Sequence, residues 1–168
     1  MIRTNIQNIE ENIKDACMRV GRDYNEITLI AVSKTQTLSK MKEVVNNGVN
    51  IFGENKVQEL VEKFDNLPDS VHWHMIGHLQ RNKVKYIIDK VELIHSVDSI
   101  RLAKQIEKEA SKREIDVDVL IEVNIANEAS KFGFSVDEVE SAIIEISKFK
   151  HINIKGLMAI APYVEYPE

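Results

Sequence analysis

Residues 27–39 read ITLIAVSKTQTLS. The first part is a short run of apolar and β-branched residues, which is typical of a strand buried on both faces of a parallel sheet. The second part is polar and contains no glycine. A doubly wound dinucleotide-binding fold should have a glycine-rich turn after its first strand. The segment therefore favours a (β/α)8 barrel over a doubly wound open sheet.

The alternation of apolar runs and polar stretches continues along the whole chain. Runs rich in Val and Ile are followed by lysine- and glutamate-rich segments with a helical period of about 3.6 residues. This pattern indicates right-handed βαβ units and a parallel sheet. The predicted strands are 27–33, 49–52, 71–76, 92–95, 117–123 and 152–158, and the predicted helices are 4–20, 39–46, 56–64, 81–89, 100–112 and 136–149.

The number of strands fits part of a barrel. A (β/α)8 barrel has eight strands and typically takes about 250 residues, whereas this chain has 168. We therefore expect one domain of the α/β class over residues 1–168, a TIM-barrel-like fold with about six strands that lacks the last two βα units.

Composition excludes several classes of protein. The formal net charge is −5, so no excess of Lys and Arg exists to neutralise nucleic-acid phosphates or an anionic membrane. The single cysteine, Cys17, rules out a disulfide framework. Charged residues interrupt the amino-terminal segment where a secretory signal would be apolar, and no stretch approaches the roughly 20 apolar residues of a membrane span. We expect a soluble, cytoplasmic protein.

Residues with useful chemistry should collect at the carboxyl ends of the strands, where barrel proteins place their sites. These ends are mostly polar. They carry Lys34, Asn55, His74, Ser96, Asn124 and Met158.

Lys34 is the candidate with the most specific chemistry. It shares strand parity with Ile30 and Val32, which predicts that its side chain leaves from a buried face. Burial would lower the pKa of its ammonium from about 10.4, and a neutral amine can form a Schiff base with a carbonyl compound. The alternative is a lysine whose charged end reaches solvent at the mouth of the barrel.

The other candidates have plausible structural roles as well. His72, His74 and His78 could suggest a metal site, but no carboxylate lies at a supporting spacing, so we expect no metal there. A hydrogen-bonding His74 is the simpler interpretation. Asn55 and Gly53 could cap the next helix, since Asn and Gly are common in turns and caps.

Six motifs in order carry a resemblance to a known family. They read AVSKT, FGENKVQE, WHMIGHLQRNK, SVDS, EVNIANEASKFG and GLMAIAP. In these motifs and their spacing, the sequence resembles the pyridoxal-phosphate homeostasis proteins, single-domain relatives of the barrel domain of alanine racemase. The resemblance covers nearly the whole chain after the first helix, and six ordered motifs are more specific than any one of them.

The resemblance implies a fold, a ligand and a role. The fold is a (β/α)8-like barrel of the alanine racemase N-terminal type, in which Lys34 holds pyridoxal 5′-phosphate as a Schiff base. The other five residues at the strand ends would lie around this cofactor. Relatives act in vitamin B6 and amino-acid homeostasis without robust catalytic activity, with pyridoxal-phosphate enzymes as possible recipients, and we expect the intact protein to be a monomer.

Two features of the family bear on activity. Racemisation needs a base on each face of the reacting carbon. In alanine racemases, which this family resembles, the second base is a tyrosine from another domain. We interpret Tyr163 and Tyr166 of this chain as loop residues. Family members also continue into segments that bind the phosphate. A racemase-like pyridoxal-phosphate enzyme and a cofactor-free, aldolase-like Schiff-base barrel remain alternatives.

Overall fold

The computed structural model describes residues 1–126 and 132–161. Its strands form one six-stranded sheet in which every neighbouring pair is parallel. The strands are β1 (Ala31–Val32), β2 (Ile51–Glu54), β3 (His72–Met75), β4 (Leu93–Val97), β5 (Val117–Glu122) and β6 (Ile152–Met158).

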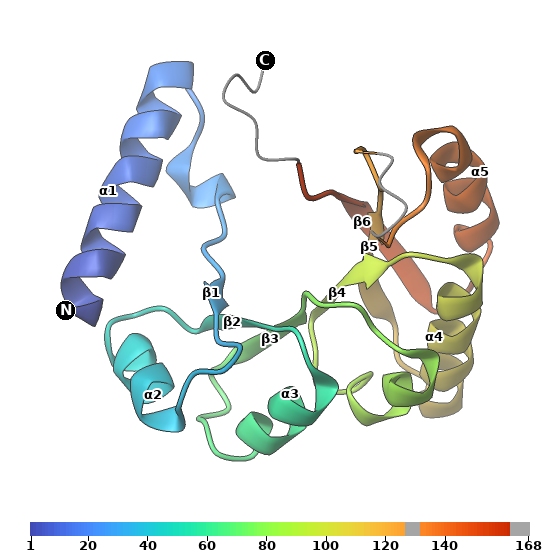
Figure 1. Cartoon of the computed structure of the whole chain (residues 1–168), viewed down its shortest axis with the longest axis horizontal. Coiled ribbons are helices and arrows are strands. Elements are labelled where there is room, and N and C mark those ends of the chain that lie inside the picture. Colours follow the sequence, from blue (N-terminus) through green and yellow to red (C-terminus); the bar gives the residue numbers. More distant parts are fainter. Residues whose placement is uncertain (127–131, 162–168) are drawn as a thin grey trace.

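The order of the strands in the sheet is the same as their order in the sequence, from β1 to β6. A doubly wound sheet would instead reverse its order at a switch point. The sheet is also curved, so that one of its faces is concave, as Figure 1 shows. Sequential order and curvature are the arrangement of a barrel, so the predicted α/β, TIM-barrel-like fold is confirmed.

Helices cover the outer side of this curved sheet. Figure 1 shows α2 to α5 on that side, with α1 standing beside the β1 edge. No helix within the described ranges is both long enough and apolar enough to cross a membrane. The helices are α1 (Ile2–Val20), α2 (Leu38–Asn46), α3 (Val57–Phe64), α4 (Ile100–Arg113) and α5 (Val136–Ile146), and two short 3-10 helices are η1 (Tyr24–Glu26) and η2 (Arg81–Tyr86).

The helices begin and end at residues that satisfy their free backbone groups. The Ser99 hydroxyl accepts a hydrogen bond from the Leu102 amide at the start of α4. Ser135 and Glu138 form a reciprocal capping box at the start of α5. Gly21 follows α1 with φ of 67°, the left-handed conformation in which glycine carries no steric penalty.

The apolar core lies between the sheet and the outer helices. Along β5 the burial alternates, so Val117, Val119 and Ile121 are buried whereas Asp118 and Glu122 are only partly buried. Because successive side chains of a strand point to opposite faces, the first group faces the helices and the second faces the concave side of the sheet. The concave side is therefore the more polar face of this strand.

Side chains on the concave side are exposed towards both edges of the sheet. Asp118 accepts a hydrogen bond from Asn153 at 3.0 Å and forms an ion pair with Lys155 at 3.1 Å. Apolar residues are exposed there too: Val32 on β1 is 51% exposed and Leu157 on β6 is 57% exposed. Within the described part of the chain, these two edge positions are therefore only about half covered.

Several predicted elements differ from those in the structure. Residues 81–89 do not form the predicted α-helix but the 3-10 helix η2, which is shorter. The first strand was predicted over 27–33 and is only Ala31–Val32, because only these two residues form a ladder with β2. The remaining predicted helices and strands are present, with ends shifted by a few residues.

Candidate functional site

Lys34 lies in the turn that follows β1, and its side chain is exposed. The predicted buried environment is therefore wrong. Strand parity places Lys34 on the same face as Val32, but Val32 is itself 51% exposed because the described chain covers this edge of the sheet only in part. The Lys34 amine forms no hydrogen bond or ion pair within the described residues. It is thus accessible to a small molecule from solvent.

His74 projects from β3 and contacts a histidine on the next strand. Its Nδ1 lies 2.9 Å from Nε2 of His95, and the rings are 5.1 Å apart between centroids. Burial lowers the pKa of His74 below its ordinary value. Burial and the adjacent His74 lower the pKa of His95 to about 4. Both imidazoles are therefore neutral near neutral pH, and one ring donates its N–H to the other.

Asn55 follows β2 and is half-buried. It lines a small cavity of about 210 Å³ together with His78 and Gln80. The chain passes very close by at Gly77, where a Cβ atom would lie 2.4 Å from the Asn55 carbonyl oxygen. Glycine at position 77 therefore lets the turn after β3 pack directly on the turn after β2.

Ser96 lies in a disturbed part of β4. The register between β4 and β5 shifts between Ile94 and Val97, a bulge of the kind that re-aims side chains near sites. Ser96 is 1% exposed, and its hydroxyl has no hydrogen-bond partner within the described residues. An unpaired buried hydroxyl is costly and rare, which makes Ser96 a candidate for contact with a ligand or water.

Asn124 and Met158 lie at the ends of two neighbouring strands, β5 and β6. Met158 ends β6, and its carbonyl accepts a hydrogen bond from the Val123 amide at 2.8 Å. The amide of Asn124 donates to the Phe134 carbonyl, also at 2.8 Å. The structure thus places both residues at the carboxyl ends of β5 and β6, as predicted, while residues 127–131 of the EVNIANEASKFG motif lie outside the described ranges.

The three histidines weighed as metal ligands separate in the structure. His72 pairs with Glu92, His74 with His95, and His78 with Asp98. In the described residues, no group of three or more potential ligands converges on one point. Each histidine therefore has its own hydrogen-bonding role.

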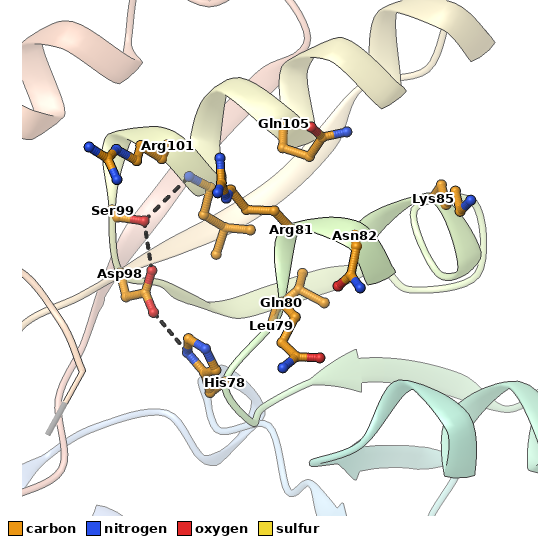
Figure 2. Close-up of a pocket in the computed structure, with 11 residues that line it drawn as sticks. His78, Leu79, Gln80, Arg81, Asn82, Lys85, Asp98, Ser99, Arg101 and Gln105 are labelled. Carbon is orange, nitrogen blue, oxygen red and sulfur yellow. Dashed lines mark hydrogen bonds and ion pairs between the residues drawn. The ribbon is translucent and has the colours of Figure 1, made fainter. Parts of the chain in front are cut away.

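Sequence reasoning missed the cavity shown in Figure 2, which has a volume of about 720 Å³. It lies between η2 and the start of α4, and none of the six predicted site residues lines it. Asp98 accepts from Ser99 and pairs with His78, both at 2.9 Å, on one wall. The other charged residues that line it are basic: Arg81, Lys85 and Arg101.

Glu122 on β5 was also missed. Burial raises the pKa of its carboxyl group, the nearby charge of Asp98 raises it further, and His78 opposes these effects. The ring of Phe132 stacks on His78 with centroids 3.7 Å apart. The ends of β3, β4 and β5 therefore meet in one polar cluster, and the signal in the sequence was the polar residue after each apolar run.

Comparison with known proteins places the chain in a family. The family model described as "Alanine racemase, N-terminal domain" matches residues 4–168. The chain belongs to this family. A curated relative, the pyridoxal phosphate homeostasis protein of Aquifex aeolicus, is 42% identical over 97% of this chain and 72% of its own length. The protein of the same name from Escherichia coli K12 is 35% identical over 98% and 73%, respectively, so this member of the family is also one of the pyridoxal phosphate homeostasis proteins.

Solved structures agree with this assignment. A protein from Bifidobacterium adolescentis described as unknown superposes with a TM-score of 0.92 at 30% identity, over 98% of this chain and 71% of its own. PipY of Synechococcus elongatus with pyridoxal phosphate bound gives 0.77 at 28% identity, over 96% and 71%. Alanine racemase of Clostridium difficile gives 0.75 at 18% identity, over 96% and 40%, which supports the fold alone.

Proposed function

We propose that this member of the family binds pyridoxal 5′-phosphate through a Schiff base on Lys34 and acts in vitamin B6 and amino-acid homeostasis in the cytoplasm. The observation that carries the proposal is an exposed amine at the carboxyl end of β1 that has no hydrogen-bond or ion-pair partner among residues 1–126 and 132–161. Relatives named pyridoxal phosphate homeostasis protein and the PipY structure with pyridoxal phosphate bound support the choice of ligand.

The residues at the strand ends fit this cofactor in part. The Lys34 amine can attack an aldehyde carbon, and one water leaves as the imine forms. Bound pyridoxal phosphate supplies that aldehyde and an electron-withdrawing ring. Asn55 is half-buried beside a cavity, and the Ser96 hydroxyl has no hydrogen-bond partner in the described part of the chain, so it can donate to a ligand. We also propose that His74, Asn124 and Met158 lie around the bound cofactor.

The proposed role is binding without robust catalysis. Racemisation requires a second base opposite the lysine. The imidazoles of His74 and His95 are hydrogen-bonded to each other, and Tyr163 and Tyr166 lie outside the described residues. We propose that the cofactor is held for delivery to pyridoxal-phosphate enzymes, and that the intact protein is a monomer whose barrel is completed by two further βα units.

The direct test is chemical trapping on Lys34. The purified chain is mixed with pyridoxal phosphate, reduced with borohydride and digested, and the modified peptide is identified by mass spectrometry. We expect one reduced adduct on Lys34, with the visible absorbance of an imine before reduction. Lys34→Ala should lose both signals, whereas Lys42→Ala, which removes an exposed lysine of α2, should keep them.

Two outcomes would contradict the proposal. Equal labelling of wild type and Lys34→Ala would show that the adduct forms on other lysines. Rapid entry of solvent deuterium at the α-carbon of an amino acid, dependent on Lys34, would favour a racemase-like enzyme over a non-catalytic carrier.

A further inference from the structure

Lys34 is exposed, yet the backbone that carries it is held tightly by another element. The preceding residue, Ser33, is 2% exposed, and the following residue, Thr35, has φ of 60°. A left-handed conformation is uncommon for a residue other than glycine and persists only where neighbouring groups stabilise it. The neighbouring element here is α3, which lies beside this turn (Figure 1).

Two side chains of α3 form hydrogen bonds with the two peptide groups on either side of the Lys34 Cα. The Lys63 ammonium donates to the Ser33 carbonyl oxygen at 2.8 Å, which belongs to the peptide before Lys34. The Glu59 carboxylate accepts from the Thr35 amide at 2.9 Å, which belongs to the peptide after Lys34. Together these contacts restrain the position of the Cα and the direction in which the side chain leaves it.

The two side chains are coupled to each other and to the sheet. Lys63 and Glu59 are four residues apart on α3 and form an ion pair at 3.1 Å. Lys63 also pairs with Glu54 at the end of β2, whose side chain is fully buried. The same carboxylate of Glu54 accepts a hydrogen bond from the Ser33 hydroxyl at 2.8 Å. The network therefore connects β1, β2 and α3 at one point.

The Lys63 ammonium has an acceptor for each of its donors, whereas the second carboxylate oxygen of Glu54 is buried without a hydrogen-bond partner in the described residues. An ammonium has three N–H donors, and Lys63 directs them at three acceptors: Ser33, Glu54 and Glu59. The Thr35 amide lowers the pKa of Glu59, and Lys63 adds to that effect. Glu59 is therefore ionised at neutral pH. Because the Lys63 side chain is only 9% exposed, loss of one partner would leave buried charge uncompensated.

We propose that Glu59 and Lys63 are positioning residues that hold the Lys34 turn in the conformation required for imine formation. This inference rests on the proposed role of Lys34. It assigns to α3 the function of a clamp, defined as Glu59 and Lys63, which restrains the backbone of the reactive lysine without contacting the ligand.

The test compares two substitutions of one residue. Glu59→Gln keeps an oxygen that can accept from the Thr35 amide, whereas Glu59→Ala removes it. We expect Glu59→Ala to slow formation of the borohydride-trapped Lys34 adduct with pyridoxal phosphate by about tenfold, the usual scale for a lost hydrogen bond, while Glu59→Gln stays within about threefold of wild type. Thermal unfolding of both variants checks that they remain folded.

A second substitution addresses Lys63. The double variant Lys63→Met/Glu54→Gln keeps the apolar stem and removes both buried charges together, so that neither is left unpaired. It should fold and show a slow adduct rate similar to that of Glu59→Ala. The matched control is Lys112→Met, which removes a lysine paired at 2.9 Å with the buried Glu109 on α4 and should leave the adduct rate unchanged.

Amide hydrogen exchange at Thr35, measured by NMR without cofactor, separates this proposal from the proposed function. If the Thr35 amide is protected from exchange in Glu59→Gln and loses this protection in Glu59→Ala, the result supports the clamp. This holds even if the wild-type protein forms no adduct with pyridoxal phosphate, because the missing adduct would refute only the Schiff base. Equal adduct rates in wild type and Glu59→Ala would overturn the clamp. Equal slowing in the Ala and Gln variants would also overturn it, because charge and not the hydrogen bond would then be responsible.

Discussion

The contact between His74 and His95 places two imidazoles where only one proton can be shared. Their nitrogens are 2.9 Å apart, so one ring must accept while the other donates, and adding a second charge would break this arrangement. Burial already disfavours the charged form of each ring. Burial therefore favours the neutral form of both rings in the folded protein, and protonation of both would also leave two N–H donors facing each other.

This arrangement predicts acid sensitivity at His95. Its pKa is about 4 in the folded protein, whereas the ordinary pKa of a histidine is 6.5, so between these values the unfolded chain binds more protons. The stabilisation is complete above about pH 6.5 and is lost as the pH falls towards 4. From about pH 7 to about pH 5 we expect the free energy of unfolding to fall by on the order of 2 kcal/mol.

Urea unfolding at the two pH values measures this dependence. His95→Gln should show a smaller loss than wild type, although not none, because the pKa of His74 is lowered as well. His151→Gln, a substitution near the other end of the sheet where His151 contacts Asp116, serves as the control. An identical pH dependence in wild type and His95→Gln would contradict the assignment.

Among the elements, the turns after β2 and β3 show how closely two loops can approach. A Cβ at Gly77 would lie 2.4 Å from the carbonyl oxygen and 2.6 Å from the Cα of Asn55. These are backbone atoms, which cannot move away as a flexible side chain can. The close packing of these two turns therefore depends on glycine at position 77, and it holds the backbone of Asn55 in place.

Gly77→Ala should therefore destabilise the protein by about 1–3 kcal/mol, the usual cost of forcing extra volume into a packed site. Gly156→Ala is the matched control, because its Cβ would meet only Leu120 at 3.7 Å, an ordinary contact. Chemical unfolding of both variants measures the difference. A Gly77→Ala protein as stable as Gly156→Ala would show that the two turns move apart freely.

The elements also show what sequence patterns can and cannot predict. The six strands and their sequential barrel-like order follow from the alternation of apolar and polar segments, which reports burial directly. The segment 81–89 has helical periodicity but folds as η2, because periodicity does not distinguish a short 3-10 turn from an α-helix.

The candidate site was predicted less completely than the fold. The strand ends indicate Lys34 and His74, but strand parity does not reveal whether the face that carries Lys34 is covered by other parts of the chain. His95 and Glu59 were missed because their roles depend on contacts between residues about twenty positions apart. Such contacts are properties of the folded chain and leave no local pattern in the sequence.

At the scale of the whole molecule, the sheet has a covered outer side and two accessible edges. In the described residues, β1 pairs only with β2 and β6 only with β5. Leu157 on β6 is 57% exposed. Edge strands with exposed apolar residues favour association between chains. We therefore expect the 168-residue chain to self-associate weakly through these edges.

Leu157→Lys should reduce this association by about tenfold, because a lysine on an edge strand opposes pairing with another sheet. The control is Ile144→Lys on the outer helix α5, where Ile144 is similarly exposed at 53%. Sedimentation velocity over a range of concentrations measures the effect. Equal weakening by both substitutions, or a wild-type chain that stays monomeric throughout, would contradict the prediction.

The sequential order of the strands has a consequence for biosynthesis. Ala31 pairs with Phe52, and Ile51 pairs with His72, so each new strand joins the one synthesised just before it. Short separations between partners keep the entropy cost of closing each loop small. A nascent chain emerging from the ribosome can therefore add each strand from β2 to β6 to the strand made just before it during translation.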